Sequence, residues 1–180
     1  MVSFGNNTYE LVICGSPRSI GVSNEYSTAL AAQFESQGKQ VRRWNVADHA
    51  VSGCIGCEAC RGDAHECAQS DDMGELYELL DGSSALHVVS PVYFSGPPSQ
   101  FKAVLDRLQP YWECRRGPNA VPGAAQAPKR PAELHVIGQG GDPFGFSSLE
   151  TCVRSALGAA GWNVLAVHNH IGWEQQKERF

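Results

Sequence analysis

The sequence lacks any long hydrophobic run, and this absence sets the first limit on its function. No stretch of about 18 consecutive apolar residues, the length that predicts a transmembrane helix, occurs in the 180 residues. The first residues also lack the basic segment and apolar core of a signal peptide, so we expect none. With a net charge of −5, the chain has no basic surface suited to nucleic acid. We therefore expect neither a membrane nor a nucleic-acid partner.

Internal repeats, low-complexity tracts and an evident linker are absent too. Residues 1–180 are therefore expected to form a single domain, with a cysteine-rich loop at 52–70. A hydrophobic content of 42% and a charged content of 18% are typical of a globular protein with a sizeable core. Cysteines in a chain without an export signal favour the reducing cytoplasm as its location.

The seven cysteines are unevenly distributed, and four of them lie in the cysteine-rich loop. These four are Cys54, Cys57, Cys60 and Cys67, with the spacing C-x2-C-x2-C-x6-C. Disulfides between such close cysteines are strained. Structural zinc sites usually use two separated pairs of cysteines, and this sequence has no second pair. Three thiolates on one tight loop suit the corners of an iron–sulfur cluster, which is the interpretation we favour. Zinc, redox-active thiols and structural cysteines remain as alternatives.

No other residues form a recognisable catalytic or metal-binding motif. The six histidines are scattered along the sequence, and only His49 and His65 flank the cysteine-rich loop as candidate substitute ligands. Cys14, Cys114 and Cys152 lie apart and are expected to be structural. Without a Ser/His/Asp or Cys/His triad, we expect no side-chain catalytic residue, so the chemistry would come from a cofactor.

Short apolar segments alternate with helical patterns along the whole chain. Strands are expected at residues 9–14, 41–46, 85–90, 134–137 and 164–167. This alternation predicts a parallel sheet with helices on both faces, and right-handed connections leave few topologies. We expect an α/β, flavodoxin-like three-layer sandwich with a five-stranded sheet in the order 2-1-3-4-5. Residues 109–132, with five prolines, are expected to be irregular after a helix ended by Pro110, and to form a lid or a subunit contact, with a disordered segment as the alternative.

The loop after the first expected strand has the character of a phosphate-binding loop. It lies between a strand and a helix start, where free backbone N–H groups and the helix dipole bind anions. Its candidate phosphate ligands are Ser16, Arg18, Ser23 and Asn24. The loop matches neither the dinucleotide-binding nor the NTPase pattern. A plain turn with a serine or asparagine helix cap is the alternative.

Two further loops are expected to lie beside it. In the order 2-1-3-4-5 a crevice opens at the carboxyl ends of strands one and three, with the loop after strand four alongside. A phosphate-binding loop facing an aromatic loop predicts flavin mononucleotide (FMN) in this crevice. The candidate flavin contacts are Pro91, Val92, Tyr93, Phe94, Ser95 and Gly96 after strand three, and Gly138, Gln139, Gly140 and Asp142 after strand four.

Several of these segments together resemble a known family. The runs Gly15-Ser16-Pro17-Arg18 with Ser23-Asn24, Pro91-Val92-Tyr93-Phe94, and Lys102 with Asp106-Arg107 resemble the flavodoxin-like NADPH-dependent FMN reductases. The block from Gly53 to Cys60, with Cys67 and Asp71-Asp72-Met73, is similar to the iron–sulfur flavoprotein branch of that family.

This resemblance implies a function. It implies FMN in the crevice, a 4Fe–4S cluster on the four cysteines close to the flavin, and a homodimer or homotetramer. The protein would be an FMN-dependent oxidoreductase or electron-transfer flavoprotein, with NAD(P)H or a ferredoxin as donor and a small molecule as acceptor. The alternatives are a cluster-free NAD(P)H-dependent FMN or quinone reductase and, third, a zinc-stapled binding protein on the same scaffold.

Overall fold

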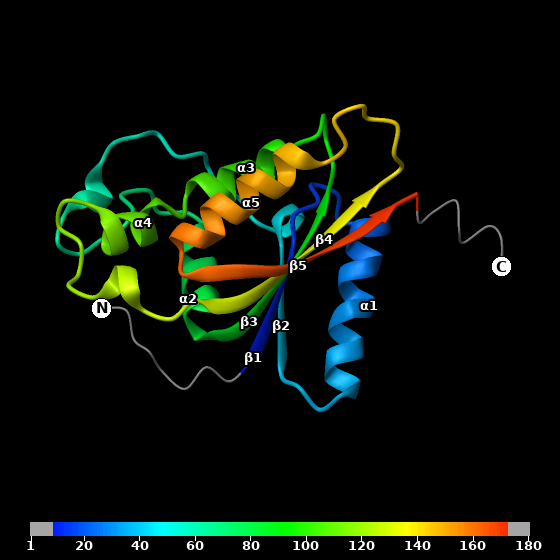
Figure 1. Cartoon of the computed structure of the whole chain (residues 1–180), viewed down its shortest axis with the longest axis horizontal. Coiled ribbons are helices and arrows are strands. Elements are labelled where there is room, and N and C mark those ends of the chain that lie inside the picture. The colour runs from blue at the N-terminus through cyan, green and yellow to red at the C-terminus, as the bar shows by residue number, and fades with distance from the viewer. Residues whose placement is uncertain (1–8, 173–180) are drawn as a thin grey trace.

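The computed structural model describes residues 9–172, which pack around one five-stranded parallel sheet. Its strands are β1 (Tyr9–Cys14), β2 (Val41–Asn45), β3 (Ser83–Pro91), β4 (Arg130–Gly138) and β5 (Trp162–Ile171). The strand order is β2-β1-β3-β4-β5 with every neighbouring pair parallel, which confirms the predicted flavodoxin-like topology (Figure 1). The expected absence of a signal peptide concerns residues outside the described range.

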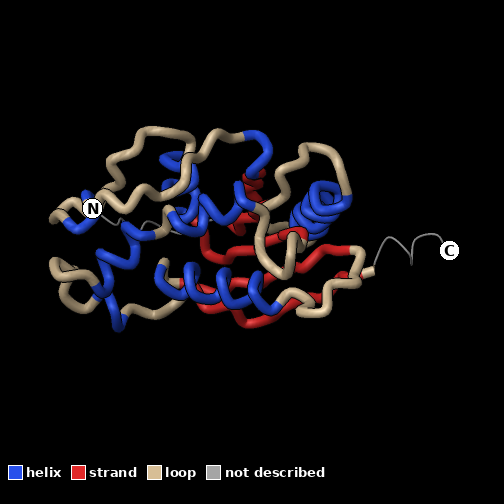
Figure 2. The backbone as a smooth tube through the Cα atoms, turned by 90° about the horizontal axis from the view of Figure 1, so that it is seen from above, coloured by secondary structure: helices blue, strands red, loops and turns tan. Residues whose placement is uncertain are grey.

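Helices cover both faces of the sheet, but unequally. They are α1 (Val22–Ser36), α2 (Met73–Gly82), α3 (Ser99–Asp106), α4 (Gln109–Arg116) and α5 (Ser147–Ala159). Helix α1 packs on one face against β1, β2 and β3, while α2, α3 and α5 share the larger core on the other face (Figure 1). Figure 2 shows the strands lying between the helices, as a three-layer sandwich requires. None of the helices within residues 9–172 is long and apolar enough to cross a membrane.

The two cores follow the alternation of side chains along the strands. Leu11, Ile13 and Trp44 belong to the larger core, whereas Val12 and Val89 pack beneath α1. This is the period of two that a strand imposes on its side chains.

Three strands are longer than the apolar runs predicted. β3, β4 and β5 extend beyond 85–90, 134–137 and 164–167, and the pairing of β4 with β5 continues to Gly138 opposite Ile171. Their ends are rich in polar residues, such as Ser83 and Ser84 on β3 and residues 168–170 on β5, so hydrophobicity alone undercounts them. Ladder hydrogen bonds to the neighbouring strand extend the sheet regardless of side-chain polarity.

The segment 109–132 is more regular than expected, and the expectation that Pro110 ends a helix was wrong. Helix α3 stops at Asp106, and Pro110 lies in the first turn of α4. Proline has no N–H to donate and a helical φ, so the first turn is where a helix tolerates it best. After α4 the chain folds back on it, since the Val121 N–H donates to the Cys114 carbonyl over 2.8 Å. A role as a lid or subunit contact stays a prediction.

Candidate functional site

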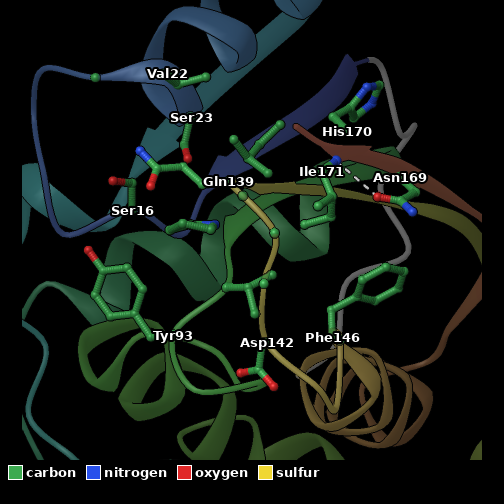
Figure 3. Close-up of a pocket in the computed structure, with 18 of the residues that line it drawn as sticks. Ser16, Val22, Ser23, Tyr93, Gln139, Asp142, Phe146, Asn169, His170 and Ile171 are labelled. Atoms are coloured by element: carbon green, nitrogen blue, oxygen red, sulfur yellow. Dashed lines mark hydrogen bonds between the residues drawn. The ribbon is translucent and has the colours of Figure 1, made fainter. Parts of the chain in front are cut away.

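A cavity of about 660 Å³ lies at the carboxyl ends of the strands, as the topology predicts. Its walls come from the loops after β1, β3 and β4, from the start of α5 and from the end of β5. Figure 3 shows Ser16, Ser23 and Gln139 on one side of this cavity, with Phe146 and Asn169 on the other. We call it the crevice cavity.

Ten of the fourteen predicted flavin contacts line the crevice cavity. They are Ser16, Arg18, Ser23, Pro91, Val92, Tyr93, Gly138, Gln139, Gly140 and Asp142. Segments separated by more than a hundred residues in the sequence thus meet around one space. The size of that space and its mixed polar and apolar lining suit a cofactor with a charged tail and a flat ring.

The β1–α1 loop has the form of an anion site at its helix end. Gly21 is the N-cap of α1 with φ 143°, and no side chain makes a capping hydrogen bond there. The alternative of a serine or asparagine cap therefore does not describe this loop. Ser16 accepts a hydrogen bond from the Arg18 N–H at 3.2 Å, and Ser16 and Ser23 are both buried against the cavity wall. The helix dipole at the first turn of α1 and the hydroxyls of Ser16 and Ser23 are therefore available to bind an anionic group.

Four predicted contacts lie outside the crevice cavity. The Asn24 side chain closes its own loop by donating to the Ser19 carbonyl at 2.5 Å. Phe94 has φ 49° and is fully exposed, so its ring points to solvent. Ser95 is buried beneath α5, where its carbonyl accepts from the Leu149 N–H at 2.8 Å, and Gly96 pairs back with Tyr93. The backbone dihedral angles of the turn decide where these side chains point. The composition of the loop does not predict those angles.

The structure adds cavity residues that the sequence reasoning missed. The main group comes from the end of β5, namely Asn169, His170 and Ile171. The Ile171 N–H donates to the Asn169 side chain at 2.9 Å, which fixes this strand end beside the cavity (Figure 3). The strand predicted at 164–167 ends before these residues, so the sequence did not place them at the crevice. Residues 168–170 are His-Asn-His, so hydrophobic alternation gave no signal for this strand end.

The four predicted metal-binding cysteines gather around a second, smaller cavity of about 140 Å³. Cys54, Cys57, Cys60 and Cys67 all contribute to its wall, and none is in a disulfide. Gly56, with φ 64°, and Glu58, with φ 61°, provide the tight turns that bring the sulfurs to one side. We call this the thiol cavity. His49 and His65 do not line it, and His49 instead stacks on Trp44 at 4.4 Å.

The donor set at the thiol cavity bears on the metals proposed for it. A tetrahedral zinc ion with bonds of about 2.3 Å holds its sulfurs about 3.8 Å apart. Within residues 9–172, no three of the cysteines approach within 4.8 Å of one another. A cubane cluster binds each thiolate at a different corner and needs a wider set. The four thiolates at the thiol cavity fit the donor set of an iron–sulfur cluster.

A buried ion pair joins the two ends of the cysteine-rich loop. Arg107 is 1% exposed and binds Asp71 through two hydrogen bonds of 2.8 and 3.0 Å. The same guanidinium donates to the Ser52 carbonyl at 3.0 Å, and the Ser52 N–H donates to Asp71 at 2.9 Å. Although burial raises it, hydrogen bonds from Arg107 and the backbone bring the pKa of Asp71 below its usual value. This pair fixes the loop whose cysteines line the thiol cavity.

The topology and the two cavities together define a class of protein. A flavodoxin-like sheet with a cofactor-sized crevice at its switch point is the arrangement in which doubly wound proteins, flavin-binding ones among them, hold a ligand. Residues 10–150 match the family model described as NADPH-dependent FMN reductase, and the chain belongs to that family. This confirms the family predicted from the sequence, and the family supports FMN as the cofactor.

The relatives identified by sequence carry iron–sulfur names. An iron–sulfur flavoprotein of Archaeoglobus fulgidus is 35% identical over 99 residues, which cover 55% of this chain and 44% of that protein. One of Methanosarcina thermophila is 33% identical over 95 residues, covering 53% and 49%. The predicted likeness to this branch is thus confirmed. The chain spans about half the length of the curated relatives it matches.

Solved structures share the fold at low sequence identity. The RosB crystal structure with a bound flavin-derived intermediate aligns with a TM-score of 0.68 and 16% identity, covering 95% of this chain and 71% of that one. A Bacillus anthracis FMN-dependent NADH-azoreductase in complex with FMN gives 0.66 and 13%, covering 92% and 88%. At these identities the likeness establishes the fold alone.

Proposed function

We propose that the chain is a single flavin-binding domain that binds FMN in the crevice cavity and a 4Fe–4S cluster in the thiol cavity, as an FMN-dependent oxidoreductase. The observation that carries this proposal is that four cysteines line one cavity on a scaffold whose other cavity has the shape and lining for a flavin. Bound FMN would accept and donate electrons in one- or two-electron steps, and the cluster would pass single electrons.

The protein's own part in this chemistry is binding and orientation. Ser16, Arg18 and Ser23 would hold the FMN phosphate at the start of α1, where the helix dipole favours an anion. The residues 91–93 would border the ring on one side, and 138–142 on the other. The Asp71–Arg107 pair would keep the cysteine-rich loop in one conformation, so that thiolates need not be ordered when a cluster binds.

The donor and the assembly are part of the proposal. NAD(P)H or a ferredoxin would supply electrons, and a small molecule would accept them. The fully exposed Phe94 lies next to Tyr93 at the mouth of the crevice cavity, and Phe144 is exposed on the β4–α5 loop. Exposed aromatic side chains beside a site are typical of an interface, which supports a homodimer or homotetramer in which subunits complete each other's sites.

A second candidate function is a cluster-free NAD(P)H-dependent FMN or quinone reductase. The family description itself favours it, because it names NADPH and FMN and no cluster. Exposure of Cys54 and Cys57 is compatible with free thiols as well.

Anaerobic purification, followed by an absorbance spectrum and by iron, acid-labile sulfide and zinc analysis, tests these functions. We expect flavin bands over a broad shoulder, with about four irons per chain for a cubane on four thiolates. Flavin bands without iron would establish the cluster-free reductase. Zinc without flavin would overturn both and favour the zinc-stapled binding protein.

The replacement Arg18→Ala is expected to weaken FMN binding about 10-fold or more, because a hydrogen bond to a charged group contributes about 1.5–3 kcal/mol. Equilibrium dialysis of the flavin measures this. Arg42→Ala is the matched control, since Arg42 is also exposed but lies on β2 away from the crevice cavity. Equal FMN affinity in the two variants would contradict the phosphate assignment.

A further inference from the structure

The histidines that look scattered in the sequence are gathered in the structure. Four of the six lie on the sheet face that α1 covers, namely His87 on β3, His135 on β4, and His168 and His170 on β5. His135 stacks with His168 at 4.5 Å and with His170 at 5.9 Å between ring centroids. Strand pairing brings these four residues together, although they are far apart in the chain.

A carboxylate occupies the centre of this group. The Glu133 Oε2 atom lies 3.0 Å from His168 Nε2, 3.7 Å from His87 Nδ1 and 3.8 Å from His135 Nε2. Glu133 precedes His135 by two residues on β4, so both side chains point to the same face. Glu133 and His168 are partly exposed, which leaves a path from solvent into the group.

Of the three ring nitrogens in the group that are buried and lack a hydrogen-bond partner, one is His170 Nε2 and the other two lie near Glu133. These two are His87 Nδ1 and His135 Nε2, on residues that are 6% and 3% exposed. Both face the Glu133 carboxylate. Buried polar atoms without a partner are costly, and in native structures they call for an ion or water. Among residues 9–172, this is the one place where three metal-ligating groups come within 4.8 Å of one another.

The opposite nitrogen of each ring is already engaged. His87 Nε2 lies 3.2 Å from the Glu10 carboxylate, and His135 Nδ1 lies 3.0 Å from the Tyr26 hydroxyl. If these nitrogens carry the ring protons, each donates to its oxygen partner and the other nitrogen presents a lone pair towards Glu133. A histidine fixed in this way by a second hydrogen bond is the usual arrangement around a protein-bound metal.

We infer that His87 Nδ1, His135 Nε2 and Glu133 bind a divalent transition-metal ion of the zinc class on this face of the sheet. Ligands at about 2.0–2.1 Å from a tetrahedral zinc lie about 3.4 Å apart, close to the separations of 3.7 and 3.8 Å between Glu133 and the two nitrogens. His168 would hold the carboxylate, and the fourth metal position would open towards solvent. This site uses nitrogen and oxygen donors, and is separate from the thiol cavity.

The test compares the wild-type full chain, carrying its own cofactors, with the variant Glu133→Gln. Both have the same cysteine-rich loop, so metal bound there cancels in the difference. After dialysis against a chelator and titration with Zn²⁺, we expect one more zinc per chain in the wild type than in Glu133→Gln. With Co²⁺ as the probe, the difference spectrum should show ligand-field bands without the intense charge-transfer bands that thiolates give.

Two further variants separate ligation from stability. Tyr26→Phe removes only the hydroxyl that positions His135, and we expect it to weaken Zn²⁺ binding about 10- to 100-fold while the chain stays folded. His49→Gln, at a histidine stacked on Trp44 and outside the group, should bind Zn²⁺ as the wild type does. Equal zinc stoichiometry in the wild type and Glu133→Gln, or a difference spectrum with thiolate bands, would overturn the site. Should Glu133→Gln unfold, the Tyr26→Phe affinity decides.

Discussion

Replacing Cys57 with alanine is expected to abolish bound iron while FMN stays bound. The thiol cavity loses one of the four sulfurs that line it, whereas no cysteine lines the crevice cavity. A cubane requires all four thiolates, so about four irons per chain should be lost together with the broad absorbance shoulder. Iron and sulfide analysis, with the flavin-to-protein ratio from the spectrum, measures both effects after anaerobic purification.

Cys152→Ala is the matched control for this experiment. Cys152 is a partly buried cysteine on α5 that lines neither the thiol cavity nor the crevice cavity. Its replacement should leave iron and FMN at wild-type levels. Full iron occupancy in Cys57→Ala would refute the ligand assignment, and simultaneous loss of flavin would show that the two cavities do not bind independently.

Replacing Arg107 with methionine is expected to destabilise the protein by about 3–5 kcal/mol, because it leaves the charge of Asp71 without its partner in a buried setting. The two ends of the cysteine-rich loop would also separate, since Arg107 binds the Ser52 carbonyl as well as Asp71. Urea unfolding measures the free energy, and the rate of thiol alkylation in the folded state measures how far the loop opens.

The chain offers a close control on the preceding helix. Lys102 and Asp106 on α3 form an exposed ion pair, with 2.6 Å between Lys102 Nζ and Asp106 Oδ1. Lys102→Met removes the cation of this pair, as Arg107→Met removes the cation of the buried pair. Exposed pairs contribute about 0–1 kcal/mol, so Lys102→Met should leave the unfolding midpoint nearly unchanged. Similar losses in both variants would contradict the special role of the Asp71–Arg107 pair.

The same pair predicts a dependence of stability on pH. The pKa of Asp71 is lower in the folded protein than its usual value. The stability from this carboxylate is therefore fully present above the unfolded-state pKa of about 3.9 and is lost as the pH falls through the folded value. In Asp71→Asn this part of the acid dependence should disappear, which urea midpoints measured between neutral and acidic pH will test.

The position of the crevice cavity was predictable from the sequence, but its full lining was not. The loops after β1, β3 and β4 were identified from composition, and fixed topology brings the carboxyl ends of parallel strands together. Phe94 and Tyr93 are neighbours in the same loop, yet only Tyr93 lines the cavity. The φ of 49° at Phe94 turns its ring outward. Residue propensities do not predict the dihedral angle of a single residue, so the sequence could not show this.

The sequence by itself determined the order of strands and helices and the spacing of the four clustered cysteines, since these depend on residues close together in the chain. Only the tertiary structure decided which distant residues meet. Asp71 and Arg107 are 36 positions apart, and the pairing of β3, β4 and β5 is what surrounds Glu133 with three histidines. The physical reason is that side-chain direction and strand register follow from packing of the whole sheet, whereas periodicity records only which residues are buried.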